Sequence, residues 1–358
     1  MAGPTIAHAI DQDKLHAFLG KVIGDFGAAL SSGLVYIGQK LGLYQAMAGA
    51  GPLTPTELAE RTGTVERYVR EWLINQAASG YVEYDPVTGR YTLPAEQAAA
   101  LTDETYPLYV GGGFYVIKAM LASQARIAEA FRKGGGVLWG EHDPDLFIGT
   151  ERFFRPGYAT HLVAEWIPAL NGVAAKLAAG VEVADVGCGH GASTIIMAKA
   201  YPKSHFWGLD NHEASIRYAR SAAAEAGVGD RVRFEVADAK HIPDNHYHLI
   251  TLFDCLHDMG DPVGAIRRAN KTLVADGSVL IVEPMAGNTV QDNFNPIGRT
   301  FSAASTLCCT ANSMALNGPA LGAVATEEAI RATVLAGGFT QFRRATQTPF
   351  NRIFEARH

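Results

Sequence analysis

The sequence is poor in cysteine and in charged residues. Its 358 residues include four cysteines, Cys188, Cys255, Cys308 and Cys309, and Asp, Glu, Lys and Arg together make up 18% of the chain. None of the cysteines forms a Cys-x-x-Cys pair and two of them are adjacent, so the sequence predicts neither a zinc site nor a disulfide framework. This cysteine usage fits a reduced cytoplasmic setting.

A basic excess and a long apolar run are also missing. The formal net charge is −6, which gives no reason to expect nucleic acid or an anionic membrane as a partner. The first residues lack the basic-then-apolar layout of a signal peptide, and no uninterrupted apolar run is long enough to span a bilayer. We therefore expect a cytoplasmic protein with neither a nucleic acid nor a membrane as its partner.

What the chain does have is enough apolar sequence for a large core, with 48% hydrophobic residues. Its length predicts two domains. Residues 1–12 are expected to form a loose arm. From Asp13 to Leu30 apolar residues recur at helical spacing, and a second helix is expected over residues 31–47.

The next segment carries the signals of a winged helix. Thr54-Pro-Thr-Glu57 is a capping box with proline at the first helical position, and it predicts a short helix ending near Gly63. Thr64 can cap a second helix. Residues 81–84 and 90–93 flank a turn and predict a hairpin. Two helices joined by a tight turn and followed by a hairpin make a winged helix.

The charge of this segment argues against DNA binding. Between Leu53 and Gly80 there are three arginines, no lysine and four glutamates. A helix that reads the major groove needs a basic footprint for the phosphates. A dimerisation module is the preferred interpretation. A ligand-sensing regulator that binds DNA through this winged helix is the alternative from a different functional class.

The segment from residue 95 to 180 is predicted to be helical and contains many aromatic residues. Two glycine triplets, Gly111-Gly-Gly113 and Gly134-Gly-Gly136, are expected to interrupt the helices. The segment is expected to link the domains and to line one wall of a substrate pocket. Its aromatic residues are Tyr106, Tyr109, Phe114, Tyr115, Trp139, Phe147, Phe153, Phe154, Tyr158 and Trp166.

A glycine-rich turn follows. Residues 181–186 read as a buried parallel strand, and a helix is expected from Ala192 to Tyr201. Between them Gly187, Gly189 and Gly191 allow a tight turn with bare backbone, which is how a doubly wound sheet opens its ligand crevice. At this point two ligands remain open, a dinucleotide and S-adenosylmethionine.

Further strands are predicted after the turn, over residues 205–209, 231–236, 248–253 and 277–283, with a closing antiparallel pair over 339–342 and 350–355. Four strand ends are acidic: Asp185, Asp210, Asp238 and Asp254. Because the carboxyl ends of parallel strands share one edge, these carboxylates collect where open α/β sheets bind ligands. Asp210 can accept hydrogen bonds from the hydroxyls of an adenosine ribose.

Residues 181–357 resemble a class I S-adenosylmethionine-dependent methyltransferase. The matching stretches are Ala184-Asp-Val-Gly-Cys-Gly-His-Gly191, Gly208-Leu-Asp210, Ala237-Asp-Ala239, Phe253-Asp-Cys-Leu-His-Asp258 and Asp276-Gly-Ser-Val-Leu-Ile-Val-Glu283. With the winged helix, the likeness extends to bacterial small-molecule methyltransferases similar to the plant-type O-methyltransferases. The C-terminal hairpin, and the position of the glycine turn after a helical N-terminal half, disfavour a dehydrogenase.

The resemblance implies an α/β fold, a doubly wound Rossmann-like seven-stranded sheet with an antiparallel last strand, plus an α-rich N-terminal winged-helix domain. It predicts a helical winged-helix and dimerisation domain over residues 1–100, a linker and pocket segment over 101–180, and a cofactor-binding domain over 181–358. It also implies a homodimer formed through the N-terminal domain and a small-molecule substrate.

The cofactor is expected to be S-adenosyl-L-methionine, leaving as S-adenosyl-L-homocysteine, with no metal. The expected cofactor-binding residues are Asp185, Gly187, Cys188, Gly189, Gly191, Asp210, Asn211, Asp238, Ala239, Phe253 and Asp254. The nearby histidines His241, His246 and His248 are interpreted as a solvated loop and not as metal ligands.

Leu256-His257-Asp258 matches the stretch that holds the catalytic base in plant-type O-methyltransferases. An imidazole titrates near neutral pH and can take the proton of an acceptor hydroxyl. Glu283 is placed to orient it, so the expected catalytic residues are His257, Glu283 and Asp258. Many methyltransferases keep a histidine here only to shape the pocket, so both roles stay open. N-, C- or carboxyl-methylation by proximity is the alternative chemistry.

An insertion over residues 288–325 precedes the last helix. It has few charges, and we expect a partly helical lid over the acceptor that determines substrate choice. Its noted residues are Asn293, Phe294, Asn295, Arg299, Phe301 and Met314.

Overall fold

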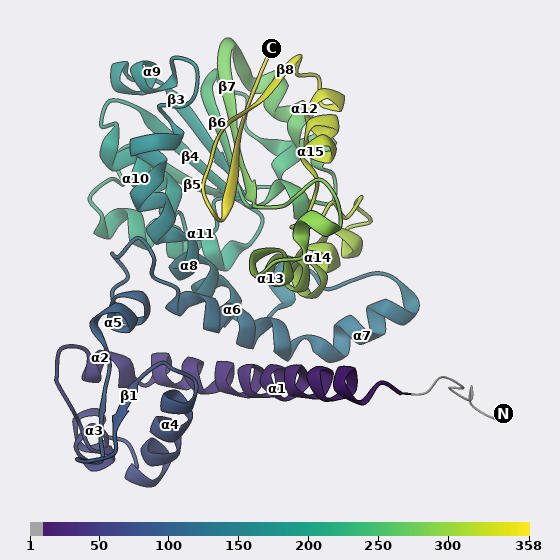
Figure 1. Cartoon of the computed structure of the whole chain (residues 1–358). Helices are drawn as coiled ribbons and strands as arrows, with labels where there is room; N and C mark the ends of the chain where they lie inside the picture. Colours follow the sequence, from purple (N-terminus) through teal and green to yellow (C-terminus); the bar gives the residue numbers. More distant parts are fainter. Residues whose placement is uncertain (1–9) are drawn as a thin grey trace. The chain divides into compact units, whose positions relative to one another are not determined.

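The computed structural model describes residues 10–358, and the chain divides into two compact units, residues 1–103 and 104–358 (Figure 1). The arm predicted over residues 1–12 lies, except for its last three residues, outside the described part of the chain. The helical segment after residue 103 belongs to the same unit as the large sheet.

The first unit begins with one long helix, α1 (Gln12–Lys40), followed by the short α2 (Leu43–Met47). The expected break near Ser31 is wrong. The Ser31 hydroxyl is buried against the winged helix, where it accepts from Asn75 Nδ2 and bonds to the Ser79 hydroxyl. Because those contacts satisfy the serine side chain, it does not compete for the helix backbone. The chain instead turns at Gly42, which adopts a left-handed φ of 69°.

The winged helix forms as predicted, from α3 (Pro55–Thr62), α4 (Glu66–Ala78), the antiparallel strands β1 (Glu83–Asp85) and β2 (Arg90–Thr92), and α5 (Ala95–Thr102). The capping box between Thr54 and Glu57 is present. Arg90 of β2 donates to the Glu57 carboxylate and so ties the hairpin to α3. Thr64 does not cap α4, because its hydroxyl bonds to that of Thr62 instead.

Helix α1 is long enough and apolar enough to cross a membrane, judged by its length and composition alone. No such segment was predicted from the sequence, because polar residues interrupt its apolar ones. Only 11% of its most apolar window is buried. The exposed apolar side chains Leu19, Ile23, Phe26 and Leu30 follow one another at spacings of three and four residues. This spacing makes one continuous apolar stripe along the helix.

The second unit starts with α6 (Gly111–Ala122), α7 (Gln124–Lys133), α8 (Asp145–His161) and α9 (Val173–Ala179). The first glycine triplet was predicted to interrupt a helix, but this is wrong, because the triplet begins α6. A Cβ on Gly112 would lie 2.6 Å from the Phe153 backbone nitrogen, and one on Gly149 would lie 2.7 Å from the Tyr115 Cβ. These glycines are therefore needed where α6 and α8 pack together.

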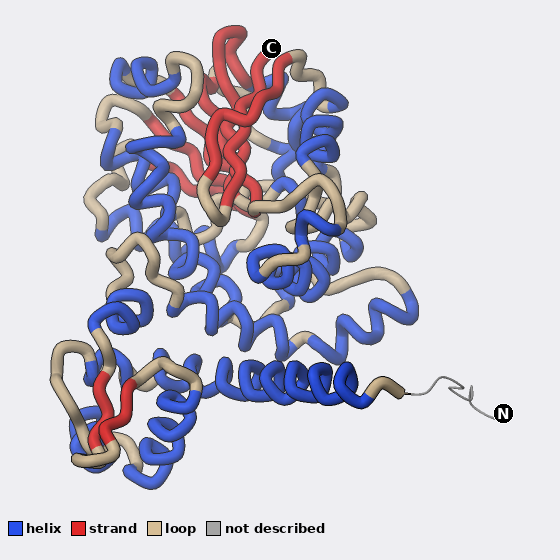
Figure 2. Tube along the Cα trace, in the orientation of Figure 1, coloured by secondary structure: helices blue, strands red, loops and turns tan. Residues whose placement is uncertain are grey.

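The large sheet, drawn in red in the upper part of Figure 2, has seven strands in the order β5-β4-β3-β6-β7-β9-β8. Its strands are β3 (Glu182–Val186), β4 (His205–Asp210), β5 (Val232–Val236), β6 (Tyr247–Phe253), β7 (Leu273–Pro284), β8 (Gln341–Gln347) and β9 (Asn351–Arg357). Strands β3 to β7 pair in parallel, and β9 pairs antiparallel with both β7 and β8. The predicted fold class is confirmed.

Helices cover both faces of this sheet. One apolar core joins it to α10 (Ala192–Ala200) and α11 (Glu213–Glu225). The other core joins it to α12 (Pro262–Thr272) and α15 (Glu327–Ala336). The insertion is partly helical, with α13 (Pro296–Ala304), a π-helical turn η6 (Ser305–Cys309) and α14 (Thr310–Ala315).

Gly191→Ala should lower the free energy of unfolding more than Gly227→Ala does. Both positions have a left-handed φ, of 80° and 70°, which costs an alanine about 1–2 kcal/mol. A Cβ at Gly191 would also lie 2.6 Å from the Phe234 ring, whereas one at Gly227 meets nothing within 4 Å. Overpacking adds about 1–3 kcal/mol. Urea unfolding of both variants measures the difference, and equal losses would contradict the packing argument.

Candidate active site

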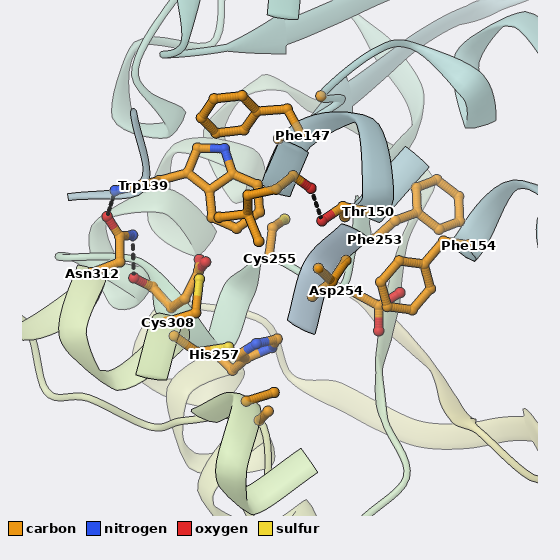
Figure 3. Close-up of a pocket in the computed structure, with 18 of the residues that line it drawn as sticks. Trp139, Phe147, Thr150, Phe154, Phe253, Asp254, Cys255, His257, Cys308 and Asn312 are labelled. Carbon is orange, nitrogen blue, oxygen red and sulfur yellow. Dashed lines mark hydrogen bonds between the residues drawn. The ribbon is translucent and has the colours of Figure 1, made fainter. Parts of the chain in front are cut away.

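A cavity of about 910 Å³ opens at the carboxyl ends of the parallel strands. Its walls come from the glycine turn after β3, the ends of β4 and β6, helices α6 and α8, and the insertion (Figure 3). Eleven of the fourteen residues predicted for the site line it: Gly187, Cys188, Gly189, Asp210, Asn211, Asp238, Ala239, Phe253, Asp254, His257 and Asp258. All four cysteines line it as well.

The glycine turn presents its backbone to the cavity. Gly187, Gly189 and Gly191 all adopt positive φ, at 73°, 53° and 80°. The N–H groups of Gly187 and Cys188 donate to the Leu209 carbonyl, and Gly189 N–H donates to Asp210 Oδ2 at 2.9 Å. The turn is therefore fixed against the end of β4 and not left as a loose loop.

Asp185, Gly191 and Glu283 were predicted for the site but are not among the residues lining the cavity. The Asp185 side chain points beneath the turn and accepts from the hydroxyls of Ser193, Thr194 and Thr251 at 2.6–2.8 Å. Burial raises the pKa of Asp185, and the three hydroxyls oppose the rise. Asp185 thus holds β3, α10 and β6 together under the turn. Gly191 is the N-cap of α10.

Asp210 lines the cavity with both carboxylate oxygens already hydrogen-bonded. Oδ2 accepts from Gly189 N–H, and Oδ1 accepts from His212 N–H at 2.8 Å. Burial raises its pKa, and the two N–H donors oppose the rise. Each oxygen of a carboxylate has a second lone pair, so Asp210 can still accept two hydrogen bonds from a ligand. Asp238 caps the short turn after β5 by accepting from Lys240 N–H.

Asp254 follows β6 with a left-handed φ of 50°, which is uncommon for a residue other than glycine. Its carboxyl accepts from Tyr158 Oη at 3.1 Å and from Asn351 Nδ2 at 2.9 Å. Burial, with the nearby charge of Glu283, raises the pKa of Asp254 to about 7. The strained backbone therefore places at the cavity wall a carboxyl group whose pKa is close to neutral pH.

His257 and Glu283 form a buried pair beside it. Nδ1 of His257 lies 2.6 Å from Glu283 Oε2, and the two side chains are 3% and 1% exposed. Burial disfavours the charged ring, but the Glu283 carboxylate and the Cys309 thiol outweigh it, so the pKa of His257 is raised well above its ordinary value. Burial also raises the pKa of Asp258 to about 7.

The insertion closes one side of the cavity. Asn312 of α14 accepts from Trp139 N–H and donates to the Asp258 carbonyl, at 2.8 and 3.0 Å (Figure 3). Of the insertion residues noted in the sequence only Phe301 lines the cavity, while Asn293, Phe294, Asn295, Arg299 and Met314 do not. The aromatic segment contributes Phe114, Trp139, Phe147, Phe153, Phe154 and Tyr158 to the wall.

No individual role was predicted from the sequence for four residues that contact the site: Tyr158, Asn351, Cys309 and Asn312. Each reaches the site from an element distant in the chain, so no local spacing marks it. The hydroxyl pair Ser193-Thr194 directly after the turn was the one local signal that Asp185 has internal partners.

Two domain families match the chain. Residues 177–333 match a methyltransferase domain, and residues 28–103 match an Rv2258c-like winged helix-turn-helix domain. Residues 177–333, which include strands β3 to β7 and the glycine turn, are therefore a methyltransferase domain, and the winged-helix domain precedes it.

The curated relatives match shorter stretches. The 27-O-demethylrifamycin SV methyltransferase of Amycolatopsis mediterranei (strain S699) is 36% identical over 118 residues, which cover 31% of this chain and 43% of the relative. Phosphoethanolamine N-methyltransferase 1 of Arabidopsis thaliana is 33% identical over 137 residues, covering 37% of this chain and 26% of the relative. The chain thus spans less than half the length of these relatives.

Solved structures share the fold along nearly the whole chain. The mitomycin 7-O-methyltransferase MmcR superposes with a TM-score of 0.74 at 17% identity, covering 97% of this chain and all of the other. Human N-acetylserotonin methyltransferase, solved in complex with SAM, gives a TM-score of 0.67 at 17% identity, covering 98% and 99%. At such identities the likeness shows the architecture.

Proposed function

We propose that this protein is an S-adenosylmethionine-dependent methyltransferase that methylates an oxygen of a small, largely apolar molecule, with His257 as the general base. The observation that carries the proposal is the buried His257–Glu283 pair, which stands at the wall of a cavity that also contains the glycine turn and Asp210.

The residues at the strand ends fit S-adenosylmethionine. The positive-φ glycines leave bare backbone at the cavity, and Asp210 keeps two free lone pairs for the ribose hydroxyls. Asp238 and Ala239 lie at the cavity after β5, where they would face the adenine. When bound, this cofactor supplies a methyl group on a sulfonium, which is a good leaving group.

The remaining cavity fits a mostly apolar acceptor. Phe114, Met120, Phe147, Phe154 and Leu307 contribute apolar surface. A cavity of about 910 Å³ is at the upper end of the usual range for ligand sites, so it has room for an acceptor beside the cofactor. The apolar walls exclude water and align the acceptor, which is the main task in a displacement reaction.

His257 is suited to take the proton that an acceptor hydroxyl loses. Glu283 occupies Nδ1, which leaves Nε2 of the ring to accept, and the carboxylate stabilises the imidazolium that forms. Asp258 is placed at the cavity beside the ring, where its carboxyl adds to the negative charge around the imidazole. We assign the catalytic roles to these three residues and the lid role to residues 288–325.

We further propose that the chain forms a homodimer through the apolar stripe of α1. Exposed large apolar side chains in this number are costly for a monomer and mark an interaction surface. A second copy presents the same stripe, which makes a self-complementary contact across a two-fold axis.

Isothermal titration calorimetry with S-adenosylhomocysteine tests the cofactor. The unmodified chain should bind it, and Asp210→Asn should weaken binding roughly 10- to 100-fold because hydrogen bonds to a charged group are lost. The control is Asp230→Asn, which removes an exposed carboxylate paired with Arg231 and should leave the affinity unchanged. Binding of a nicotinamide dinucleotide in its place would overturn the cofactor assignment.

The pH dependence of turnover tests the base. Because the pKa of His257 is raised and only the neutral ring accepts a proton, kcat should rise with pH through a pKa above about 6.5. Glu283→Gln should move this pKa down, and His257→Ala should lower kcat about 10²- to 10⁴-fold without weakening cofactor binding. The exposed His241→Ala is the control. If His257→Ala turned over at the full rate, His257 would not be the base, and methylation by proximity would remain as the mechanism.

Sedimentation equilibrium tests the dimer. The unmodified chain should have twice the mass of the monomer, and Phe26→Asp combined with Leu30→Asp should give the monomer mass. Val87→Asp alters an exposed side chain of the hairpin turn and should leave the dimer intact. A monomer that co-sediments with lipid vesicles would contradict the dimer and indicate that the stripe contacts a membrane.

A further inference from the structure

Arg352 of β9 is fully buried and carries a charge that needs compensation. Nε donates to the Pro284 carbonyl at 2.9 Å and Nη2 donates to the Ala325 carbonyl at 2.8 Å. Nη1 is buried and has no hydrogen-bond partner among residues 10–358. Carbonyl dipoles alone compensate a buried guanidinium poorly, because a charge removed from water needs an opposite charge nearby.

Among the charges near Arg352, the Glu283 carboxylate favours the guanidinium most, the Glu327 carboxylate favours it less, and the Arg344 cation opposes it. Glu283 and Arg352 are direct partners in the antiparallel pairing of β7 and β9, and partners of this kind project their side chains from the same face of the sheet. Glu283 uses Oε2 for His257, while its Oε1 is buried and has no partner within the described chain. A fully buried donor and a fully buried acceptor are therefore left over on one face, at paired positions.

We propose that Arg352 is a positioning residue for His257. It acts through Glu283 by holding the Glu283 carboxylate aimed at Nδ1, with a bound water linking Glu283 Oε1 to Arg352 Nη1. A water that bridges two buried polar groups satisfies both at little cost. The part of this inference that concerns catalysis rests on the proposed function, whereas the part that concerns the charge of the ring does not.

The charges around His257 give Arg352 its effect. The ring faces Glu283 on β7, Cys309 on η6, and Asp254 and Asp258 in the loop after β6. The carboxylates among these neighbours favour the protonated ring. In the sheet order β7 lies between β6 and β9, so Glu283 stands between His257 and the buried cation of Arg352. The positive charge of Arg352 therefore offsets part of the negative charge that Glu283 presents to His257.

Replacing Arg352 should therefore make His257 hold its proton more tightly. Loss of an opposite charge near a carboxylate changes neighbouring pKa values by about 1–3 units when the groups are close. In Arg352→Met we expect the pKa of His257 to rise by about one unit, and turnover at neutral pH to fall about tenfold and recover at higher pH. Methionine keeps the apolar length of the side chain.

NMR titration of ¹⁵N-labelled histidines in the ligand-free protein measures this pKa directly, with His257→Gln to assign the signal. Arg352→Lys, which keeps the charge, should stay near the unmodified value. Arg344→Met is the matched control, because both guanidinium groups lie over the same Phe354 ring, at 5.9 and 5.7 Å. Arg344 is partly exposed and pairs with Glu327, so its loss should move the pKa of His257 much less than the loss of Arg352 does.

If the Arg352→Met variant folds and the pKa of His257 is unchanged, the proposal is overturned. In a Glu283→Gln background the same replacement should change the pKa much less, and an undiminished change would show that Arg352 does not act through Glu283. If Arg352→Met does not fold, a high-resolution crystal structure of the unmodified chain decides, because a missing bridging water refutes the link. Failure of the methyltransferase assignment would leave the titrations as expected, so the two outcomes are distinguishable.

Discussion

The carboxylate of Asp185 is the interaction on which the ligand edge of the sheet depends. It lies at the end of β3 and receives hydroxyl donors from α10 and β6. It adds a polar contact to the apolar packing that already joins these three elements, and the glycine turn follows β3 directly. A hydrophobic residue at this position would remove the acceptor that the buried hydroxyls of Ser193 and Thr194 use, and Thr251 would keep only a longer bond to the Ala184 carbonyl. The polar contact therefore specifies the turn, while apolar packing on both faces supplies most of the stability.

The fold was predictable because β3, β4 and β6 are short apolar runs that end at, or are followed by, glycine or aspartate. The alternation from strand to helix left few topologies to consider. The errors arose where tertiary contacts override a local signal. Ser31 and Gly112 both look like interruptions, but one is held by α4 and the other lets α8 approach α6. Neither partner can be inferred from neighbours in the sequence.

The candidate site was predictable to the same extent. Glu283 lies at the end of β7, and His257 lies in the short turn after the neighbouring β6. Their meeting at one edge follows from the parallel pairing of these strands, and their hydrogen bond agrees with it. Asp185 has the same position at a strand end but turns inward, since its neighbours offer hydroxyls and not space. Tyr158 and Asn351, which hold Asp254, come from α8 and β9, and only the folded chain brings them there.

The four cysteines of the cavity have a chemical consequence for a site that holds an electrophilic methyl donor. Thiolates are strong nucleophiles, whereas neutral thiols react far more slowly. Burial raises the pKa of Cys188 and of Cys255 well above the usual range of a thiol. A hydrogen bond with the Cys308 side chain, together with burial, raises the pKa of Cys309 in the same way. The thiols of Cys188, Cys255 and Cys309 thus stay protonated and serve as small wall groups. The same burial that shapes the chamber protects it from self-alkylation.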